Sequence, residues 1–150
     1  MYRQLLVSFV LTGTALTSQA QVHEELKGKF AAVLVVTDEK ISVPVQSAPR
    51  GAKLVAIVKL VGCSANSAGN CNAEADTRIF NPNGNLDAHT EHSELWRKKA
   101  PAPGEVITGL VFGITVPPTD PIGQYRIEAT VRDLVSGQTI DLFSVVNITK

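Results

Sequence analysis

The stretch DPIGQYRIEATVRDLVSGQTIDLFSVVNI, from Asp120 to Ile148, decides the fold class of this chain. Between Gly123 and Asp133 apolar and polar residues alternate, and a period of two is typical of a β-strand with one dry and one wet face. The following DLVSGQ, which ends at Gln138, supplies Asp, Ser and Gly where the chain must reverse. The next run, TIDLFSVVNIT, is therefore predicted to return antiparallel, so that the stretch forms a β-hairpin.

Alternation in this last run predicts the direction of its side chains. The residues expected to face the core are Ile140, Leu142, Val146 and Ile148. Phe143 and Val145 then face outward, together with polar Asp141 and Asn147. A packing contact with another strand, a bulge that re-aims the two side chains, or a small binding patch would each explain this arrangement.

Further strands are predicted along the rest of the chain. Four runs are rich in Val and Ile or bounded by turn residues: Lys29 to Val36, Lys53 to Val61, Glu74 to Phe80 and Glu105 to Val116. A seventh strand is expected in NLDAHT, after the turn NPNG, and a short one around ISVPV would be confined to a sheet edge by Pro44. No helix is predicted. The pattern indicates an all-β, antiparallel β-sandwich of about seven strands.

The first twenty residues have the pattern of a secretory signal peptide. Arg3 precedes an apolar run that is too short to span a bilayer, and small residues stand at Ser18 and Ala20. Residues 1–20 are therefore predicted to be cleaved, leaving residues 21–150 as a single domain that is periplasmic or secreted. No second apolar run is long enough for a membrane span.

Export affects the interpretation of the two cysteines. Cys63 and Cys71 lie in the polar segment GCSANSAGNCN, and in an oxidising compartment they are expected to form one local, structural disulfide. A redox-active pair is the weaker alternative, because the spacing is not C-x-x-C and no cation adjoins either sulfur.

Charge and motifs exclude several function classes. Lys and Arg number 14, as do Asp and Glu, and this balance argues against binding to nucleic acid or to an acidic membrane surface. The chain lacks a G-x-S-x-G elbow, a Gly-rich phosphate loop and an H-E-x-x-H motif. We predict that the protein is not an enzyme and has no cofactor.

The stretch DPIGQY resembles the start of the penultimate strand of immunoglobulin-like domains, of the bacterial and macroglobulin types. The resemblance covers Phe30 to Lys150 and implies structural roles for Asp120, Gly123 and Tyr125. The tyrosine would place its ring in the core and bond backward to the main chain. Ile127 stands where antibody-type domains have a cysteine. The GC…GNC loop, ELW and the DPxGxY strand also resemble small exported bacterial proteins, which implies a compartment and a fold.

One cluster has the character of metal ligands. The segment LDAHTEH contains Asp87, His89, Glu91 and His92. Two imidazoles three residues apart share one face of a helical turn and could hold a divalent metal there, whereas in a strand they would face opposite ways. The neighbouring turn and polar residues favour a solvated loop without metal.

A second candidate is the loop SELWRKKAPAPGE, which contains the only tryptophan, Trp96, followed by Arg97, Lys98 and Lys99. A stiff cationic loop with an aromatic anchor is a reasonable partner-binding surface. Alternatively, Trp96 closes one end of the sandwich and the basic residues are simply solvated.

These observations predict a non-catalytic binding or structural module. Its partner would be a protein or a cell-envelope component, reached through the loops from Cys63 to Asn72 and from Asn85 to Pro103, or through a strand edge. The alternative is a small exported inhibitor, immunity protein or metal-handling protein that uses the Trp96 loop or the His89 and His92 cluster. The oligomeric state is left open.

Overall fold

The structure, a computed structural model, describes residues 24–36 and 42–150. The predicted signal peptide at residues 1–20 lies outside this range. The described part of the chain forms strands and turns without a helix, and so it has no helix able to cross a membrane. The strands are β1 Lys27–Val36, β2 Ser42–Val45, β3 Ser47–Pro49, β4 Lys53–Val61, β5 Ala73–Phe80, β6 Leu86–Trp96, β7 Ile107–Thr115, β8 Gly123–Asp133 and β9 Thr139–Thr149.

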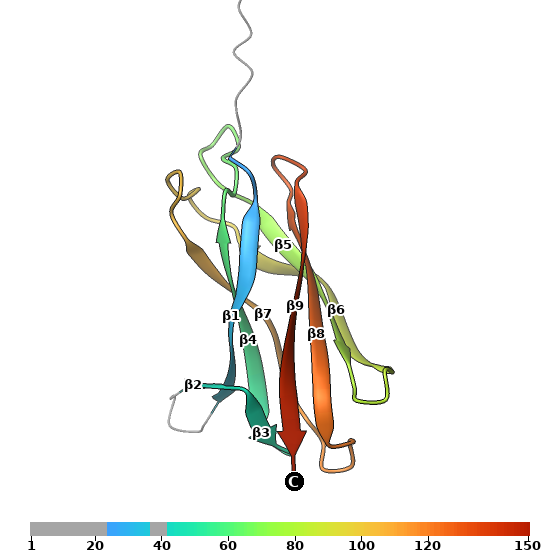
Figure 1. The fold of residues 1–150 in the computed structure, drawn as a ribbon. Helices are drawn as coiled ribbons and strands as arrows, with labels where there is room; N and C mark the ends of the chain where they lie inside the picture. The colour runs from blue at the N-terminus through green and yellow to red at the C-terminus, as the bar shows by residue number, and fades with distance from the viewer. Residues whose placement is uncertain (1–23, 37–41) are drawn as a thin grey trace, which may run out of the picture.

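These strands form two sheets, drawn in Figure 1. The four-stranded sheet has the order β2-β1-β4-β7, and the five-stranded sheet has the order β3-β9-β8-β5-β6. All neighbours are antiparallel except β3, which runs parallel to β9. The predicted all-β fold is confirmed, but the described residues form nine strands where about seven were expected. The prediction missed β3, whose three residues are too few to carry a periodic pattern.

The core lies between the two sheets. Buried side chains come from alternate positions of β4, such as Leu54, Ala56 and Val58, and of β8, such as Ile127 and Val131. This is the arrangement that a period of two produces when one face of each strand is dry. The apolar alternation seen in the sequence therefore identifies the inner face of both sheets.

The hairpin of β8 and β9 forms as predicted. The register pairs Tyr125 with Val146 and Val131 with Ile140 without a bulge. Val146 and Ile148 are buried, whereas Phe143 is 74% exposed and Val145 is 44% exposed. The prediction that these two side chains face outward is confirmed, and the continuous register excludes a bulge as the reason.

Tyr125 is 1% exposed, and its hydroxyl donates a hydrogen bond of 3.0 Å to the carbonyl oxygen of Pro121. Burial of the ring, together with the charges of Asp87 and Asp120, raises the pKa of this phenol. The side chain therefore stays neutral and ties the start of β8 to the segment before it. Gly123 has a φ of 130°, a conformation that favours glycine at this turn into the strand.

The seventh strand predicted in NLDAHT forms, and it continues to Trp96, into the segment from Asn85 to Pro103 that was also interpreted as a loop. β6 pairs with β5 at the edge of the five-stranded sheet. Most of its side chains are exposed, so the strand shows no apolar alternation that a sequence pattern could reveal. Its backbone hydrogen bonds to β5 hold it in place instead. β2 likewise lies at a sheet edge, as the position of Pro44 predicted.

Candidate functional site

The two loops that the sequence selected lie together at one end of the molecule. Cys63 and Cys71 form a disulfide, with their Cα atoms 5.8 Å apart. The amide of Cys71 donates to the carbonyl oxygen of Lys98, and the amide of Ala100 donates to that of Gly69, both at 2.9 Å. Residues 63–72 and 96–103 therefore form one unit, which we call the loop platform. It lies at the same end as the turn between β8 and β9 (Figure 1).

A buried carboxylate fastens this platform to the sheet. Asp133, at the end of β8, is 0% exposed and accepts hydrogen bonds from the amide of Ser64 at 2.9 Å, the amide of Val135 at 3.0 Å and the hydroxyl of Ser136 at 2.7 Å. Burial acts to raise the pKa of Asp133, but these hydrogen bonds outweigh it and hold the pKa below its usual range. The ionised carboxylate thus joins the disulfide loop to the hairpin turn.

The contacts of Trp96 are compatible with both roles that the sequence allowed, packing at one end of the sandwich and partner binding. Its ring is partly buried and packs against the core, which agrees with a structural role. Its indole N–H donates to the carbonyl oxygen of Lys99 at 3.0 Å, and the ammonium of Lys98 lies 5.4 Å from the ring centroid. An open cavity of about 580 Å³ lies beside the ring and is also lined by Pro101 and Val106. Trp96 therefore orders the basic loop around itself.

The three basic side chains differ in their contacts. Arg97 donates from Nε to the side-chain oxygen of Asn72 at 3.2 Å and lies 3.6 Å from a carboxylate oxygen of Glu94. Lys98 and Lys99 are exposed, and within the described residues neither forms an ion pair. Arg97 is thus held against the platform, whereas Lys98, beside the Trp96 ring, and Lys99 are exposed without an acidic partner among the described residues.

The cluster around His89 lies in β6 and not in a loop, which corrects the sequence-based interpretation. Asp87, His89, Glu91 and His92 are all exposed. His89 lies opposite Arg78 of β5 in the register of the pair. Partial desolvation and the nearby Asp120 carboxylate raise the pKa of Asp87. Among the described residues there is no group of three or more His, Cys, Asp or Glu side chains able to hold a metal ion.

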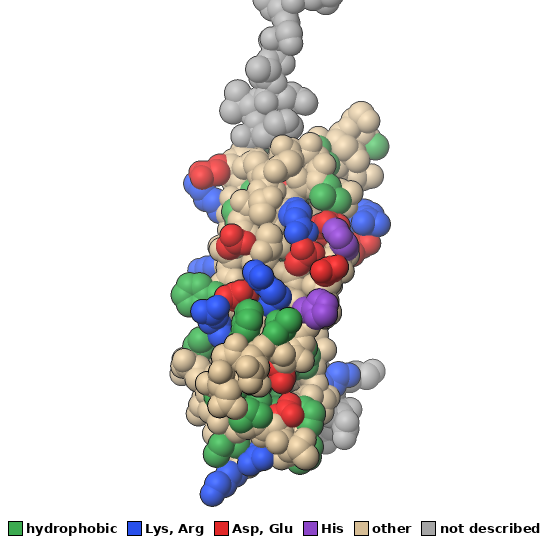
Figure 2. All heavy atoms as spheres, turned by 90° about the vertical axis from the view of Figure 1, so that its right-hand side faces the viewer, with side chains coloured by type: hydrophobic (Ala, Val, Ile, Leu, Met, Phe, Trp, Pro, Cys, Tyr) green, Lys and Arg blue, Asp and Glu red, His purple; other side chains and the backbone are tan. Residues whose placement is uncertain are grey.

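His92 instead belongs to a charged cluster that the sequence did not reveal. Its Nδ1 atom lies 2.8 Å from Oε1 of Glu74, and its amide donates to Asp76 at 2.9 Å. Arg132 of β8 forms ion pairs with both Glu74 and Asp76. Figure 2 shows acidic, basic and His side chains gathered on this face. We call these four residues the outer-face cluster.

The outer-face cluster is electrostatically self-complementary. Hydrogen bonds from Arg132 and from the amide of His92 lower the pKa of Asp76 to about 2. The hydrogen bond and charge of Glu74, with the charge of Asp76, raise the pKa of His92. A signal was present in the sequence, because Glu74 and Asp76 stand at alternate positions of a strand, but their partners lie on other strands. Because these charges are paired with one another, they link β5, β6 and β8. They leave little uncompensated charge that could bind a substrate.

Comparison with known proteins bears on the fold. No protein-family model matches the chain. No curated protein matches it in sequence. Among solved structures, a family 123 glycoside hydrolase from Clostridium perfringens aligns with a TM-score of 0.51 at 11% identity, over 85% of this chain. The chain spans only 28% of that hydrolase.

Two further structures align less well. The C-terminal domain of wzt gives a TM-score of 0.48 at 15% identity, over 82% of this chain and 74% of that domain. A Niemann-Pick type C2 protein from the Japanese carpenter ant gives 0.42 at 17% identity, over 81% of this chain and 92% of that protein. At these identities, the alignment with the hydrolase supports a shared two-sheet β fold and carries no assignment of activity.

Proposed function

We propose that the protein is a non-catalytic, exported binding module that recognises an acidic surface on a protein or cell-envelope component through its loop platform. The observation that carries this proposal is that two backbone hydrogen bonds join the basic loop to a loop closed by a disulfide, which gives a rigid support for Lys98 and Lys99. A rigid loop loses little conformational entropy when it binds, so its exposed charges can contribute to affinity. Trp96 and Arg97 position the loop, and the two lysines contact the partner.

Export is part of the proposal. The signal-like pattern of residues 1–20 supports it, and so does the disulfide, because such bonds persist in oxidising compartments. A disulfide that holds a binding loop would be lost in a reducing cytoplasm. The proposed site of action is therefore the periplasm or the exterior of the cell.

We also propose that the sandwich is of the immunoglobulin-like type. The parallel pairing of β3 with β9 supports this topology. It places a short strand from the N-terminal part of the chain, before β4, beside the last strand of the domain. The hydrogen bond from Tyr125 back to Pro121 is the contact expected of a tyrosine corner. In such domains the loops at the ends of the sheets carry recognition, which agrees with the position of the loop platform.

The proposal can be tested with residues 21–150 and a double variant, Lys98→Gln with Lys99→Gln. The matched control is Lys53→Gln with Lys59→Gln, which removes the same charge from exposed positions on β4. Partners would be captured from the source cell's envelope and culture fluid, identified by mass spectrometry and purified. Dissociation constants would then be measured at low and high salt for each variant.

We expect the Lys98 and Lys99 variant to bind about 5- to 30-fold more weakly than the parent at low salt, with a smaller dependence on salt. The control should bind as the parent does. Equal affinities for all three proteins would show that the loop platform is not the binding site. Equal losses in both variants would mean that net charge, and not this loop, determines the interaction.

A further inference from the structure

Strand β9 has one long edge that is only partly covered. On one side it pairs with β8 from Thr139 to Ile148. On the other side its neighbour is β3, which reaches only Asn147 to Thr149. Within the described residues, no strand is hydrogen-bonded to the edge from Thr139 to Val145, although β1 of the other sheet lies close to β9. An open strand edge presents unpaired N–H and C=O groups that can pair with another chain.

The backbone groups that face this open edge can be identified. The amide of Asn147 donates to the carbonyl oxygen of Gln46, which lies on the side away from β8. In a regular antiparallel pair, successive residues direct their N–H and C=O groups to opposite sides. The register of β8 and β9 is continuous, so Asp141, Phe143 and Val145 direct theirs to the same side as Asn147.

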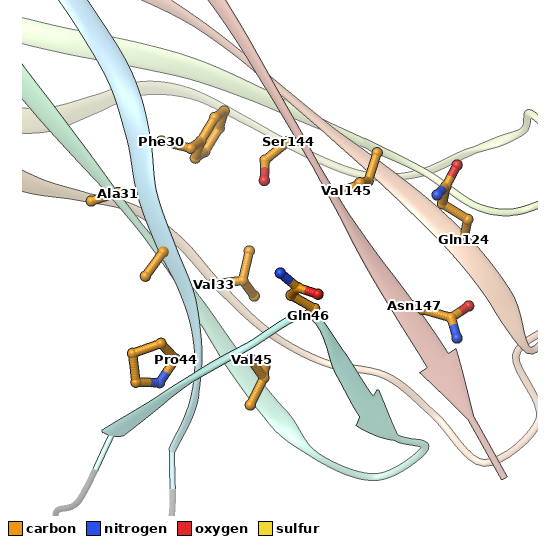
Figure 3. A pocket seen from close by; sticks show the side chains of 11 residues that line it. Phe30, Ala31, Val33, Pro44, Val45, Gln46, Gln124, Ser144, Val145 and Asn147 are labelled. Atoms are coloured by element: carbon orange, nitrogen blue, oxygen red, sulfur yellow. The ribbon is translucent and has the colours of Figure 1, made fainter.

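A groove lies beside the C-terminal part of this edge, at Ser144 and Val145, between β9 of one sheet and β1 and β2 of the other (Figure 3). Its volume is about 730 Å³. The lining is apolar along β1 and β2, at Phe30, Val33 and Val45, and carries carboxamides at Gln46 and Asn147. None of the described residues that line it is charged. The groove thus suits apolar side chains and an uncharged backbone.

We infer that the open edge of β9, with its groove, is a strand-addition site for an extended, uncharged peptide segment that has apolar side chains at alternate positions. Peptide N–H and C=O groups would pair with those of Asp141, Phe143 and Val145. Every second side chain would enter the groove, and the others would lie on the outer face beside exposed Phe143. This site is separate from the loop platform, and either can fail without the other.

Strand β3 provides the precedent within this molecule. It adds to the same edge, with Ser47 and Pro49 exposed and Ala48 only 2% exposed between the sheets. One side chain in two therefore already enters the space beneath the edge of β9. The proposed peptide continues this established interface along the remainder of the strand.

A second copy of this chain fits the groove less well than a peptide does. If β9 paired with β9 of another copy, the inward side chains Ile140 and Leu142 of that copy would face the groove. These side chains already pack against the core of their own domain, and so cannot fill it. A single extended segment has inward side chains that are not otherwise engaged. The hollow beneath the edge therefore favours a peptide.

The test uses residues 21–150 and a soluble probe, the acetylated and amidated peptide Ser-Val-Thr-Val-Ser-Val-Thr. Amide hydrogen exchange would be followed by NMR with and without the probe. At a probe concentration of roughly ten times its dissociation constant, exchange at Asp141, Phe143 and Val145 should slow by about tenfold. The amides of Ile140 and Leu142, which face β8, are protected in both states and serve as internal controls.

Two modified probes separate strand pairing from simple apolar adhesion. One carries N-methyl groups on the three valines, and the other carries them on alternate Ser and Thr residues. Alternate amides of a strand face opposite edges, so one modified peptide should lose binding and the other should retain it. Equal behaviour of the two peptides would overturn strand addition.

Protein variants locate the site. Ala31 is exposed and lines the groove, so Ala31→Trp should block it and weaken probe binding at least tenfold. If that variant does not fold, Gln46→Trp at another exposed lining position serves the same purpose. No protection at any probe concentration up to about 1 mM, a limit that corresponds to very weak binding, would overturn the inference. Protection that rises with protein concentration in the absence of probe would instead identify a second copy as the occupant.

Discussion

The Nδ1 atom of His92 lies 2.8 Å from Oε1 of Glu74, and this contact joins the edge strand β6 to the interior of the five-stranded sheet. The two side chains differ in environment: that of His92 is 71% exposed, whereas that of Glu74 is 9% exposed. The hydrogen bond to Glu74 is the largest of the effects that raise the pKa of His92. The backbone of His92 is also strained, with a φ of 53°.

The His92 and Glu74 pair predicts a stability that depends on pH. The folded-state pKa of His92 is raised above the ordinary value of 6.5, so its protonation stabilises the folded state below that pH. This stabilisation is lost as the pH rises through the folded-state pKa. We expect the difference in melting temperature between the parent and His92→Asn to be larger at pH 5.5 than at pH 9. Asn is chosen because it tolerates a positive φ.

The matched control for this experiment is His89→Asn, since His89 lies on the same strand and forms no ion pair with any described residue. The change in this difference between pH 5.5 and pH 9 should be larger for His92→Asn than for the control. A difference for His92→Asn that does not change between pH 5.5 and pH 9 would contradict the proposed linkage.

We expect Asp133→Asn to destabilise the folded protein markedly, although the two side chains have nearly the same shape. In Asp133→Asn, the NH₂ group replaces either Oδ1, which accepts from the amide of Val135, or Oδ2, which accepts from both Ser64 and Ser136. A buried donor left without its acceptor costs about 1–3 kcal/mol, more when the lost acceptor was charged. We expect urea denaturation to show this loss. The exposed change Asp141→Asn should alter stability by less than about 0.5 kcal/mol, and equal effects for both would contradict the role of Asp133.

The disulfide is expected to contribute both to the stability of the fold and to partner binding. Replacing Cys63 and Cys71 by Ser should lower the free energy of unfolding by on the order of 2.5 kcal/mol, because the closed loop is short. The parent treated with a reducing agent should match the variant. Because the loop platform depends on this loop, partner binding should also weaken in both. Unchanged binding in a folded, reduced protein would show that the disulfide is not needed to present Lys98 and Lys99.

The hydroxyl and the ring of Tyr125 are expected to contribute by different amounts to the stability of the fold. Tyr125→Phe removes the hydrogen bond to Pro121 and should destabilise the protein by about 1 kcal/mol. Tyr125→Ala also removes a buried ring, and should cost about 3–5 kcal/mol. Both values follow from chemical denaturation. If Tyr125→Phe were as stable as the parent, the hydroxyl contact would have no part in holding the turn before β8.

Strands with a strong apolar pattern were predictable from the sequence. β4 begins at Lys53 and ends at Val61, as predicted, and the hairpin of β8 and β9 has the expected inward and outward faces. The pairing of Cys63 with Cys71 was also predicted, because the two cysteines lie close together in the chain. In each case the signal is local: a period of two, a turn or a short spacing.

The outer-face cluster could not be predicted in the same way. His92 and Glu74 are 18 residues apart, and Arg132 and Asp76 are 56 residues apart. Their contacts depend on the order in which strands lie in the sheet, which side-chain periodicity does not specify. β6 was partly missed for a related reason, since its exposed side chains carry no apolar pattern and its backbone bonds to β5 define it.

Local sequence signals were sufficient for the all-β class, the faces of the strongest strands, the local disulfide and the residues of the basic loop. The folded arrangement was needed to see that the two loops form one platform, that His92 pairs with Glu74, and that β9 has an unpaired edge beside a groove. The physical reason is distance along the chain. Side-chain alternation and turn chemistry act over a few residues, whereas a sheet edge or a platform arises only when distant strands pair.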